Sequence, residues 1–307
     1  MNNHWFAIIN PASGYGKANK KWDEVAKILK AENIQYSFAF TTIHEKATVA
    51  VKTAIEKGFR QFICIGGDGH LQDTVNGILQ QNTVDSKEIT LCMISAGTGN
   101  DWIKTSGVPK DAKSAIQLIK TGKKITQNIG KINYTIQDKI AERYFINFAG
   151  VGFDAYVVSE TKSLKKYGQI AYLLGMIKCL FSYKKPTVKI SFNDTQITTP
   201  IYMAIAGVGQ YGGGGMKLMP SANLTGEDFC FVIIKNIPIW KVILNIGKLY
   251  TGTLTTLKEV DLFHTKKIKI ENINSNIPLL MESDGEDIGE GPFEISIINH
   301  KINILVP

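Results

Sequence analysis

Three short glycine-containing turns carry the residues whose types could do chemistry. The turns cover residues 10–14, 66–69 and 97–101, and each follows a short apolar run. Glycine lets the backbone approach a polyanion closely, and a helix that begins after such a turn offers unpaired N–H groups to phosphate. Ser13 and Thr98 add hydroxyl donors. The three turns predict a phosphate-binding site that differs from a P-loop and from a dinucleotide fingerprint, since the chain has no GxxxxGK[ST] motif and none of the three turns has the GxGxxG spacing.

Asp68 is the acidic residue of the central turn, Gly66-Gly67-Asp68-Gly69. A carboxylate there would repel phosphate unless a cation lies between them or unless it takes a proton from a nucleophile. Asp68 is therefore a candidate organiser of Mg²⁺ or a candidate general base. An N-cap or tight-turn aspartate without a chemical role explains the same residue. The local sequence does not decide between these interpretations.

The elements that must position these turns alternate between strand and helix. Short apolar runs predict strands, and apolar residues repeated at a spacing of three to four predict helices. Such alternation with short connections predicts a mostly parallel sheet that binds ligands at the carboxyl ends of its strands, where all three turns fall. The expected strands are 5–9, 36–41, 62–65 and 90–94, and the expected helices are 18–32, 47–57 and 71–79.

From about residue 124 onward, strand-like runs dominate and predict an antiparallel sandwich or barrel-like second domain. Two expected helices, 170–181 and 240–249, interrupt these runs. The last apolar run, 302–306, suits a strand of either domain. The other expected strands are 125–129, 144–148, 187–192, 201–206, 229–234, 267–270 and 293–298.

The composition is typical of a globular protein with an anionic partner. The chain has 307 residues and a net charge of +8, and its only arginines are Arg60 and Arg143. A lysine-rich surface favours nucleotides or acidic membranes over specific nucleic-acid recognition, which relies on Arg. The four cysteines lie far apart in apolar surroundings, which predicts reduced, buried thiols. We expect no signal peptide and no bilayer-spanning segment, and therefore a cytoplasmic protein.

The order and spacing of the motifs resemble the diacylglycerol kinase catalytic-domain family, which includes bacterial lipid kinases and sphingosine kinases. The more distant NAD kinases share the GGDG turn. The resemblance implies an α/β, NAD kinase-like nucleotide-binding domain (1–124 plus 299–307), a β-rich antiparallel lipid-substrate domain (125–298), and an ATP site in the cleft between them. The segments that carry it are 10–14, 66–77, 97–101, 147–154, 213–216 with Pro220, 284–286 and 304–307.

The resemblance also implies roles for individual residues. Asp284 and Glu286 would accept the proton of the lipid hydroxyl, and Asp68 would organise the Mg²⁺ that enters with ATP. Without the resemblance, residues 284–286 would be interpreted as a surface turn. The residues expected to bind ATP are Asn10, Ser13, Gly14, Thr41, Gly66, Gly67, Asp68, Gly69, His70, Asp73, Gly97, Thr98, Asn100 and Asp101.

Two of these positions depart from the family pattern. His70 stands where the family usually has threonine, so its ring either contacts phosphate or caps the helix. Asp73 replaces glutamate, which keeps the carboxylate and shortens its reach.

A second departure concerns a structural Mg²⁺ that the family commonly holds after the position of Pro220. Mg²⁺ prefers carboxylate oxygens, but of the three residues at the family's Mg²⁺-binding positions in this chain only Asp228 is acidic. We therefore expect this site to be absent or rebuilt from Glu227 and Asp228. The corresponding residues are Asn223, Gly226 and Asp228.

The expected helix at 170–181 has an apolar stripe flanked by lysines. Packing in the core and contact with a membrane or a lipid pocket both explain such a stripe. Each lysine near an anionic surface contributes on the order of 1 kcal/mol, so we expect peripheral contact with the inner membrane surface. An exposed strand edge would allow a homodimer. The stripe consists of Ile170, Leu173, Leu174, Ile177, Leu180 and Phe181, and the lysines are Lys162, Lys165, Lys166, Lys178, Lys184 and Lys185.

The function that these features indicate is an ATP- and Mg²⁺-dependent lipid kinase. Its acceptor would be diacylglycerol, a sphingoid base or a related lipid alcohol, and the sequence does not choose among them. A soluble kinase of the NAD kinase type is a second hypothesis. A non-catalytic protein that binds nucleotide or lipid is a third, because residues 70, 73, 225, 226 and 230 are altered.

Overall fold

Four parallel strands form the centre of the first lobe. In the computed structural model, which describes residues 4–14, 17–42, 46–97, 99–136, 139–161, 169–273 and 276–307, β1 (His4–Ile9) lies between β2 (Gln35–Phe40) and β3 (Gln61–Gly66). β3 also pairs with β4 (Thr90–Ser95). β3 and β4 are buried almost throughout, which explains their continuous apolar sequences.

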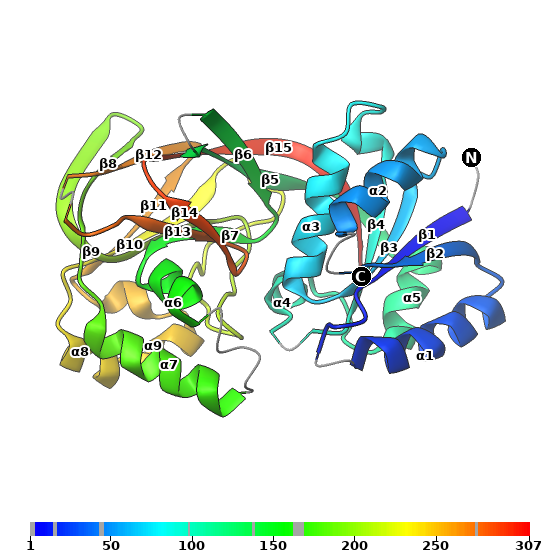
Figure 1. The fold of residues 1–307 in the computed structure, drawn as a ribbon, viewed down its shortest axis with the longest axis horizontal. Coiled ribbons are helices and arrows are strands. Elements are labelled where there is room, and N and C mark those ends of the chain that lie inside the picture. Colours follow the sequence, from blue (N-terminus) through cyan, green and yellow to red (C-terminus); the bar gives the residue numbers. More distant parts are fainter. Residues whose placement is uncertain are drawn as a thin grey trace.

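Helices cover both faces of this parallel sheet (Figure 1). α2 packs against α3, and α1 packs against α5. Three of the helices were expected, but α4 and α5 were not. The five helices are α1 (Lys17–Ala31), α2 (Ala47–Glu56), α3 (Asp68–Leu79), α4 (Asp101–Ser106) and α5 (Ala112–Thr121).

The second lobe consists mainly of antiparallel strands, as the sequence predicts. Its helices lie together at one end of the lobe (Figure 1). They are α6 (Phe153–Thr161), α7 (Gln169–Ser182), α8 (Ile239–Leu244) and α9 (Ile246–Thr251). The strands are β5 (Lys123–Ile136), β6 (Lys139–Phe145), β7 (Phe148–Gly152), β8 (Thr187–Phe192), β9 (Thr195–Gly207), β10 (Phe229–Lys235), β11 (Val260–Thr265), β12 (Lys267–Asn272), β13 (Leu280–Ser283), β14 (Glu286–Glu290) and β15 (Phe293–Val306).

Two long strands, β5 and β15, join the lobes (Figure 1). The expected strands 293–298 and 302–306 are one strand, β15, whose pairing with β5 shifts register between Ile298 and Ile302. Beyond this shift, β15 pairs in parallel with β4 and so extends the sheet of the first lobe. The cores of the two lobes meet within β5, where Ile129 belongs to the first core and Ile132 to the second.

Two other expected elements are divided in the structure. The expected strand 144–148 is interrupted at residues 146–147, which separate β6 from β7. The expected helix 240–249 is two short helices, α8 and α9, that meet at Asn245. Among the described residues, no helix is both long enough and apolar enough to cross a bilayer.

Candidate active site

The three glycine turns of the first lobe lie side by side at the carboxyl ends of the strands. The N–H of Asn10 donates to the Ile65 carbonyl at 3.1 Å, which ties the first turn to the end of β3. The second and third turns pack backbone against backbone. A Cβ on Gly97 would lie 2.6 Å from the Gly67 Cα, so this approach requires glycine.

Asp68 joins the second turn to the third. Its carboxylate accepts hydrogen bonds from the N–H groups of Asp101 at 3.1 Å and Trp102 at 3.2 Å, and so it caps α4 rather than its own helix, α3. Burial raises the pKa of Asp68, and the backbone donors lower it by less. The Asp68 Oδ2 also lies 3.3 Å from the position that a Cβ on Gly99 would take.

Asp101 connects the third turn to the second lobe. Its Oδ1 pairs with Lys104 at 2.9 Å, and its Oδ2 accepts the N–H of Gly214 at 2.7 Å. The same Oδ2 lies 3.7 Å from the Cβ position of Gly99. The carboxyl groups of Asp68 and Asp101 therefore converge on one point beside the glycine turns.

An acidic turn of the second lobe lies between β13 and β14. Asp284 and Gly285 both have positive φ, at 48° and 85°, as a two-residue type I′ hairpin turn requires. Asp284 is nevertheless buried, at 7 % exposure, which differs from the surface turn that the local sequence indicates. Its carboxylate accepts three hydrogen bonds from the backbone between β6 and β7: from the N–H groups of Ile146, Asn147 and Phe148, at 2.8, 3.1 and 2.9 Å.

The protonation of Asp284 is set by two opposed effects. Burial raises the pKa of Asp284 to about 7, although the three N–H donors act to lower it. The negative charge of Asp68 adds to the increase, which indicates that the two carboxyl groups interact across the lobes. A carboxyl group with a pKa near neutrality can exchange a proton under ordinary conditions.

Glu286, beside the acidic turn, lies close to the second glycine turn. This exposed side chain places its Oε1 at 3.5 Å from the position of a Cβ on Gly69. The three predicted catalytic residues, Asp68, Asp284 and Glu286, are thus grouped where the two lobes face each other.

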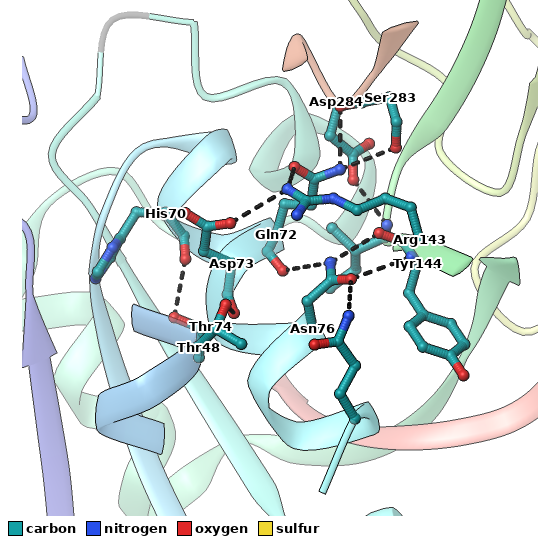
Figure 2. A network of polar contacts seen from close by, with 12 residues as sticks. Thr48, His70, Gln72, Asp73, Thr74, Asn76, Arg143, Tyr144, Ser283 and Asp284 are labelled. Atoms are coloured by element: carbon teal, nitrogen blue, oxygen red, sulfur yellow. Dashed lines mark hydrogen bonds and ion pairs between the residues drawn. The ribbon is translucent and has the colours of Figure 1, made fainter. Parts of the chain in front are cut away.

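Helix α3 holds the lobes in this arrangement through side chains whose contacts between the lobes the sequence did not predict (Figure 2). The Gln72 amide donates to the Ser283 carbonyl at 3.0 Å and to its hydroxyl at 2.9 Å. Arg143 of β6 donates to the Gln72 side chain at 2.9 Å and pairs with Asp73 at 3.2 Å. Asp73, expected at ATP, therefore takes part in a contact between lobes. No local pattern in the sequence indicates this role.

The remaining polar residues expected at ATP are placed as follows. The Asn10 side chain accepts the N–H of Ala12 at 3.0 Å, and the Thr41 hydroxyl donates to the Ile9 carbonyl at 3.3 Å, so both support the first turn. The Ser13 N–H donates to the Asn10 carbonyl, while Gly14 adopts φ 62°. Asn100 has φ 51° and donates to the Gly97 carbonyl at 2.8 Å. Thr98 lies outside the described residues.

The His70 ring does not cap helix α3. It is buried against β1, where its Nε2 is 3.1 Å from the Ile8 carbonyl oxygen, and burial lowers its pKa. The ring therefore packs inside the first lobe, against β1 and against Gly66 at the end of β3. The sequence did not reveal this because Ile8 is 62 residues earlier in the chain.

The expected position of a structural Mg²⁺ is occupied by local contacts. Asn223 Oδ1 accepts the N–H of Thr225 at 3.0 Å, and the carbonyl of Gly226 accepts the side-chain amide of Asn128. Asp228 pairs with His264 at 3.1 Å, and Glu227 with Lys266 at 3.4 Å. Within the described ranges, no group of three or more His, Cys, Asp or Glu side chains could hold a metal ion.

A pocket of about 340 Å³ in the second lobe reaches the acidic turn, because Gly285 is one of its lining residues. Most of its walls are apolar side chains of β7, β9, α8 and α9 and the segments around them. Met176 of α7 also lines it. An elongated apolar ligand could therefore reach Asp284 and Glu286 from inside the second lobe. The apolar lining includes Phe148, Met203, Leu218, Val242, Leu249 and Leu257.

Comparisons with known proteins match both lobes of the chain. Residues 4–132 match the diacylglycerol kinase catalytic domain, and residues 147–306 match the YegS C-terminal NAD kinase beta sandwich-like domain. A diacylglycerol kinase of Staphylococcus epidermidis is 30% identical, over 98% of this chain and 91% of its own.

Solved structures share the fold. The crystal structure of a diacylglycerol kinase from Bacillus anthracis has a TM-score of 0.75 at 20% identity, covering 99% of this chain and 97% of that one. Yeast NADH kinase complexed with NADH has a TM-score of 0.57 at 10% identity, covering 99% and 83%.

Proposed function

Because the chain belongs to the diacylglycerol kinase-like family of lipid kinases, we propose that it transfers the γ-phosphate of ATP to a lipid hydroxyl where its two lobes face each other. The approach of Glu286 to Gly69 carries the proposal, since it sets the acidic turn of one lobe against the glycine turns of the other. Phosphoryl transfer depends mainly on positioning and charge neutralisation, and this arrangement provides for both.

The phosphates of ATP would bind along the three glycine turns. The first N–H groups of α3, which begins at Asp68, lack partners within the helix and attract anions. The convergence of Asp68 and Asp101 beside Gly99 suits Mg²⁺, a hard cation that prefers carboxylate oxygens. Bound there, Mg²⁺ would neutralise charge on the phosphates. The His70 ring would take no part.

Asp284, with Glu286 beside it, would remove the proton of the acceptor hydroxyl. The pKa of about 7 leaves a large share of Asp284 ionised at neutral pH, and yet able to bind a proton. The three backbone donors between β6 and β7 hold the carboxylate in one orientation. Gln72 supports the turn from the other lobe through Ser283.

The lipid would reach this position from a membrane on which α7, α8 and α9 rest. Large apolar side chains on these helices are exposed: Leu244 is 76 % exposed, Phe181 68 % and Trp240 60 %. Residues 169–182 and 239–251 contain three lysines and no acidic residue, which suits an anionic surface. All three helices also line the apolar pocket, so a lipid that leaves the bilayer could enter it directly.

The exposed stripe on α7 favours membrane contact over the alternative of core packing. Leu174, Ile177 and Phe181 are all largely exposed, and only Leu180 is partly buried. The side chains of Ile170 and Leu173 lie outside the described residues, as do Lys162, Lys165 and Lys166.

The direct test is incubation of the protein with γ-labelled ATP, Mg²⁺ and mixed micelles of lipid alcohols. Labelled lipid is the expected product, and its formation should require Asp284. A parallel incubation with NAD tests the second hypothesis, a kinase of the NAD kinase type. Labelled NAD without labelled lipid would overturn the proposal, and so would ATP binding without transfer to any lipid.

A further inference from the structure

The apolar pocket has an acidic end that the transfer step does not use. Two of the residues that line the cavity, Asp154 and Glu282, are acidic. Burying a carboxylate in apolar surroundings is costly unless a partner compensates it. The question is therefore what this acidic end binds.

Local backbone geometry brings the two carboxyl groups together. Glu282 of β13 lies opposite Gly150 of β7 in antiparallel register. Asp154 is in the first turn of α6, which directly follows β7, and a Cβ on Gly150 would collide with its Oδ2. The Asp154 carboxylate therefore lies over Gly150, next to Glu282. Burial raises the pKa of Glu282, and the charge of Asp154 raises it further.

Each carboxyl group has one oxygen that accepts no hydrogen bond from the described residues. Asp154 Oδ1 accepts the N–H of Ala155 at 2.9 Å, and one oxygen of Glu282 accepts the N–H of Gly285 at 2.7 Å. The other two, Asp154 Oδ2 and Glu282 Oε1, are buried and accept no hydrogen bond from the described part of the chain. Glu282 is only 1 % exposed.

These unused oxygens destabilise the charged forms of both acids. Burial raises the pKa of Asp154 to about 7 and that of Glu282 well above its usual range. The Tyr202 hydroxyl, which also lines the pocket, is buried and has no partner either within the described residues. A buried polar cluster left incomplete in this way is expected where a ligand supplies the missing donors.

We propose that this acid pair binds the ammonium group of a single-chain lipid amino alcohol, and that such a lipid is the acceptor of the kinase. The inference rests on the proposed function and specifies its substrate. An ammonium group has three donors and a positive charge, so it can serve both unused oxygens and compensate their charge. The ester carbonyls of diacylglycerol only accept hydrogen bonds, so they cannot serve the pair in its ionised form.

The volume of the pocket supports a single chain. Small-molecule sites span about 300–1,000 Å³, and this cavity, at about 340 Å³, is near the lower limit. One hydrocarbon chain therefore fits it better than two.

The acid pair is also placed so that a neighbouring hydroxyl can react. The oxygen of Glu282 that is hydrogen-bonded contacts Gly285, the residue between Asp284 and Glu286. An ammonium group held at Glu282 would bring a hydroxyl on the adjacent carbon to the acidic turn. Recognition and proton removal would then share one hairpin, β13–β14.

Three acceptors in mixed micelles test the inference on the full-length chain. They are a long-chain 2-amino-1-alcohol, the 1,2-diol of the same chain length, and a diacylglycerol. The expected kcat/KM for the amino alcohol exceeds both others by at least about tenfold, since unpaired buried groups reject ligands that lack the donor. Equal or better use of diacylglycerol or the diol would overturn this inference while leaving the lipid kinase intact. Failure to phosphorylate any lipid would instead overturn the proposed function.

Substitutions of Asp154 and Glu282 test whether these two residues cause the preference for the amino alcohol. Glu282→Gln and Asp154→Asn should each reduce the preference for the amino alcohol over the diol by about tenfold, without changing KM for ATP. Glu290→Gln is the matched control, because it removes the same charge from an exposed position on the same hairpin. An unchanged preference in folded Glu282→Gln and Asp154→Asn would overturn the inference.

A measurement on the unmodified protein covers the case in which neither variant folds. A long-chain primary amine without a hydroxyl should compete with the lipid acceptor at least about tenfold more strongly than the alcohol of equal length. Equal inhibition by the two compounds would overturn the role of the acid pair.

Discussion

Replacing Asp284 by asparagine tests the proposed proton acceptor with little change of shape. Asparagine keeps one acceptor oxygen and replaces the other by an NH₂ donor. Asp284 Oδ1 receives two of the three backbone hydrogen bonds, from Asn147 and Phe148, and Oδ2 receives the third, from Ile146. The asparagine oxygen can keep the first two, so one buried N–H loses its acceptor.

The expected losses of stability and of transfer rate follow from this loss of one hydrogen bond and of the carboxylate. One unsatisfied buried donor costs about 1–3 kcal/mol of unfolding free energy, so the variant should fold with a lower Tm. Loss of a general base typically slows a reaction by about 10²–10⁴-fold, so transfer should fall far more than stability. The KM for ATP should change little, because Asp284 is not among the residues proposed to bind the phosphates.

Initial rates of transfer from γ-labelled ATP, measured together with thermal unfolding, check both expectations. Asp287→Asn is the matched control: Asp287 lies on the same hairpin, and among the described residues its carboxylate accepts one hydrogen bond, from the N–H of Gly289 at 3.1 Å. This control should keep nearly the whole rate. If Asp284→Asn lowered Tm but kept the rate of Asp287→Asn, Asp284 would only stabilise the turn, and the proposed base would be refuted.

Three further outcomes are expected. The rate of transfer should decline as pH is lowered through about 7, because Asp284 then gains its proton. The contribution of Asp284 to stability has the opposite pH dependence and is lost as pH rises through about 7. Rates of transfer and unfolding measured at each pH would separate the two effects, and a pH-independent rate would contradict the role of Asp284 as the base. Asp68→Ala should remove the cap of α4, at a cost of about 1 kcal/mol, and weaken Mg²⁺-dependent ATP binding by calorimetry; full retention of that binding would exclude Asp68 from the nucleotide site. Trp240→Glu combined with Leu244→Glu should reduce cosedimentation with anionic vesicles, whereas Ile140→Glu, at a position 82 % exposed on β6, should not; equal effects would remove α8 from the membrane surface.

The glycine turns could be predicted because their signals are local. A buried strand, a glycine and the start of a helix follow one another within a few residues, and the parallel order of β1, β3 and β4 then brings the turns together. The bond between His70 and Ile8 could not be predicted. Its partner lies on another strand, and nothing near His70 indicates which side of α3 faces β1. The contacts of Gln72 and Arg143 between the lobes were missed for the same reason.

The hairpin at residues 284–285 shows most clearly what the sequence determines and what the tertiary structure adds. The sequence by itself determined that an Asp-Gly pair makes a turn, because positive φ at two adjacent positions is a local backbone preference. Only the tertiary structure decided that Asp284 is buried beneath three N–H groups that lie 136–138 residues earlier in the chain, and that Glu282 and Asp154 meet over Gly150. Burial, hydrogen-bond partners and pKa depend on which distant segments pack together, and short sequence patterns do not contain that information.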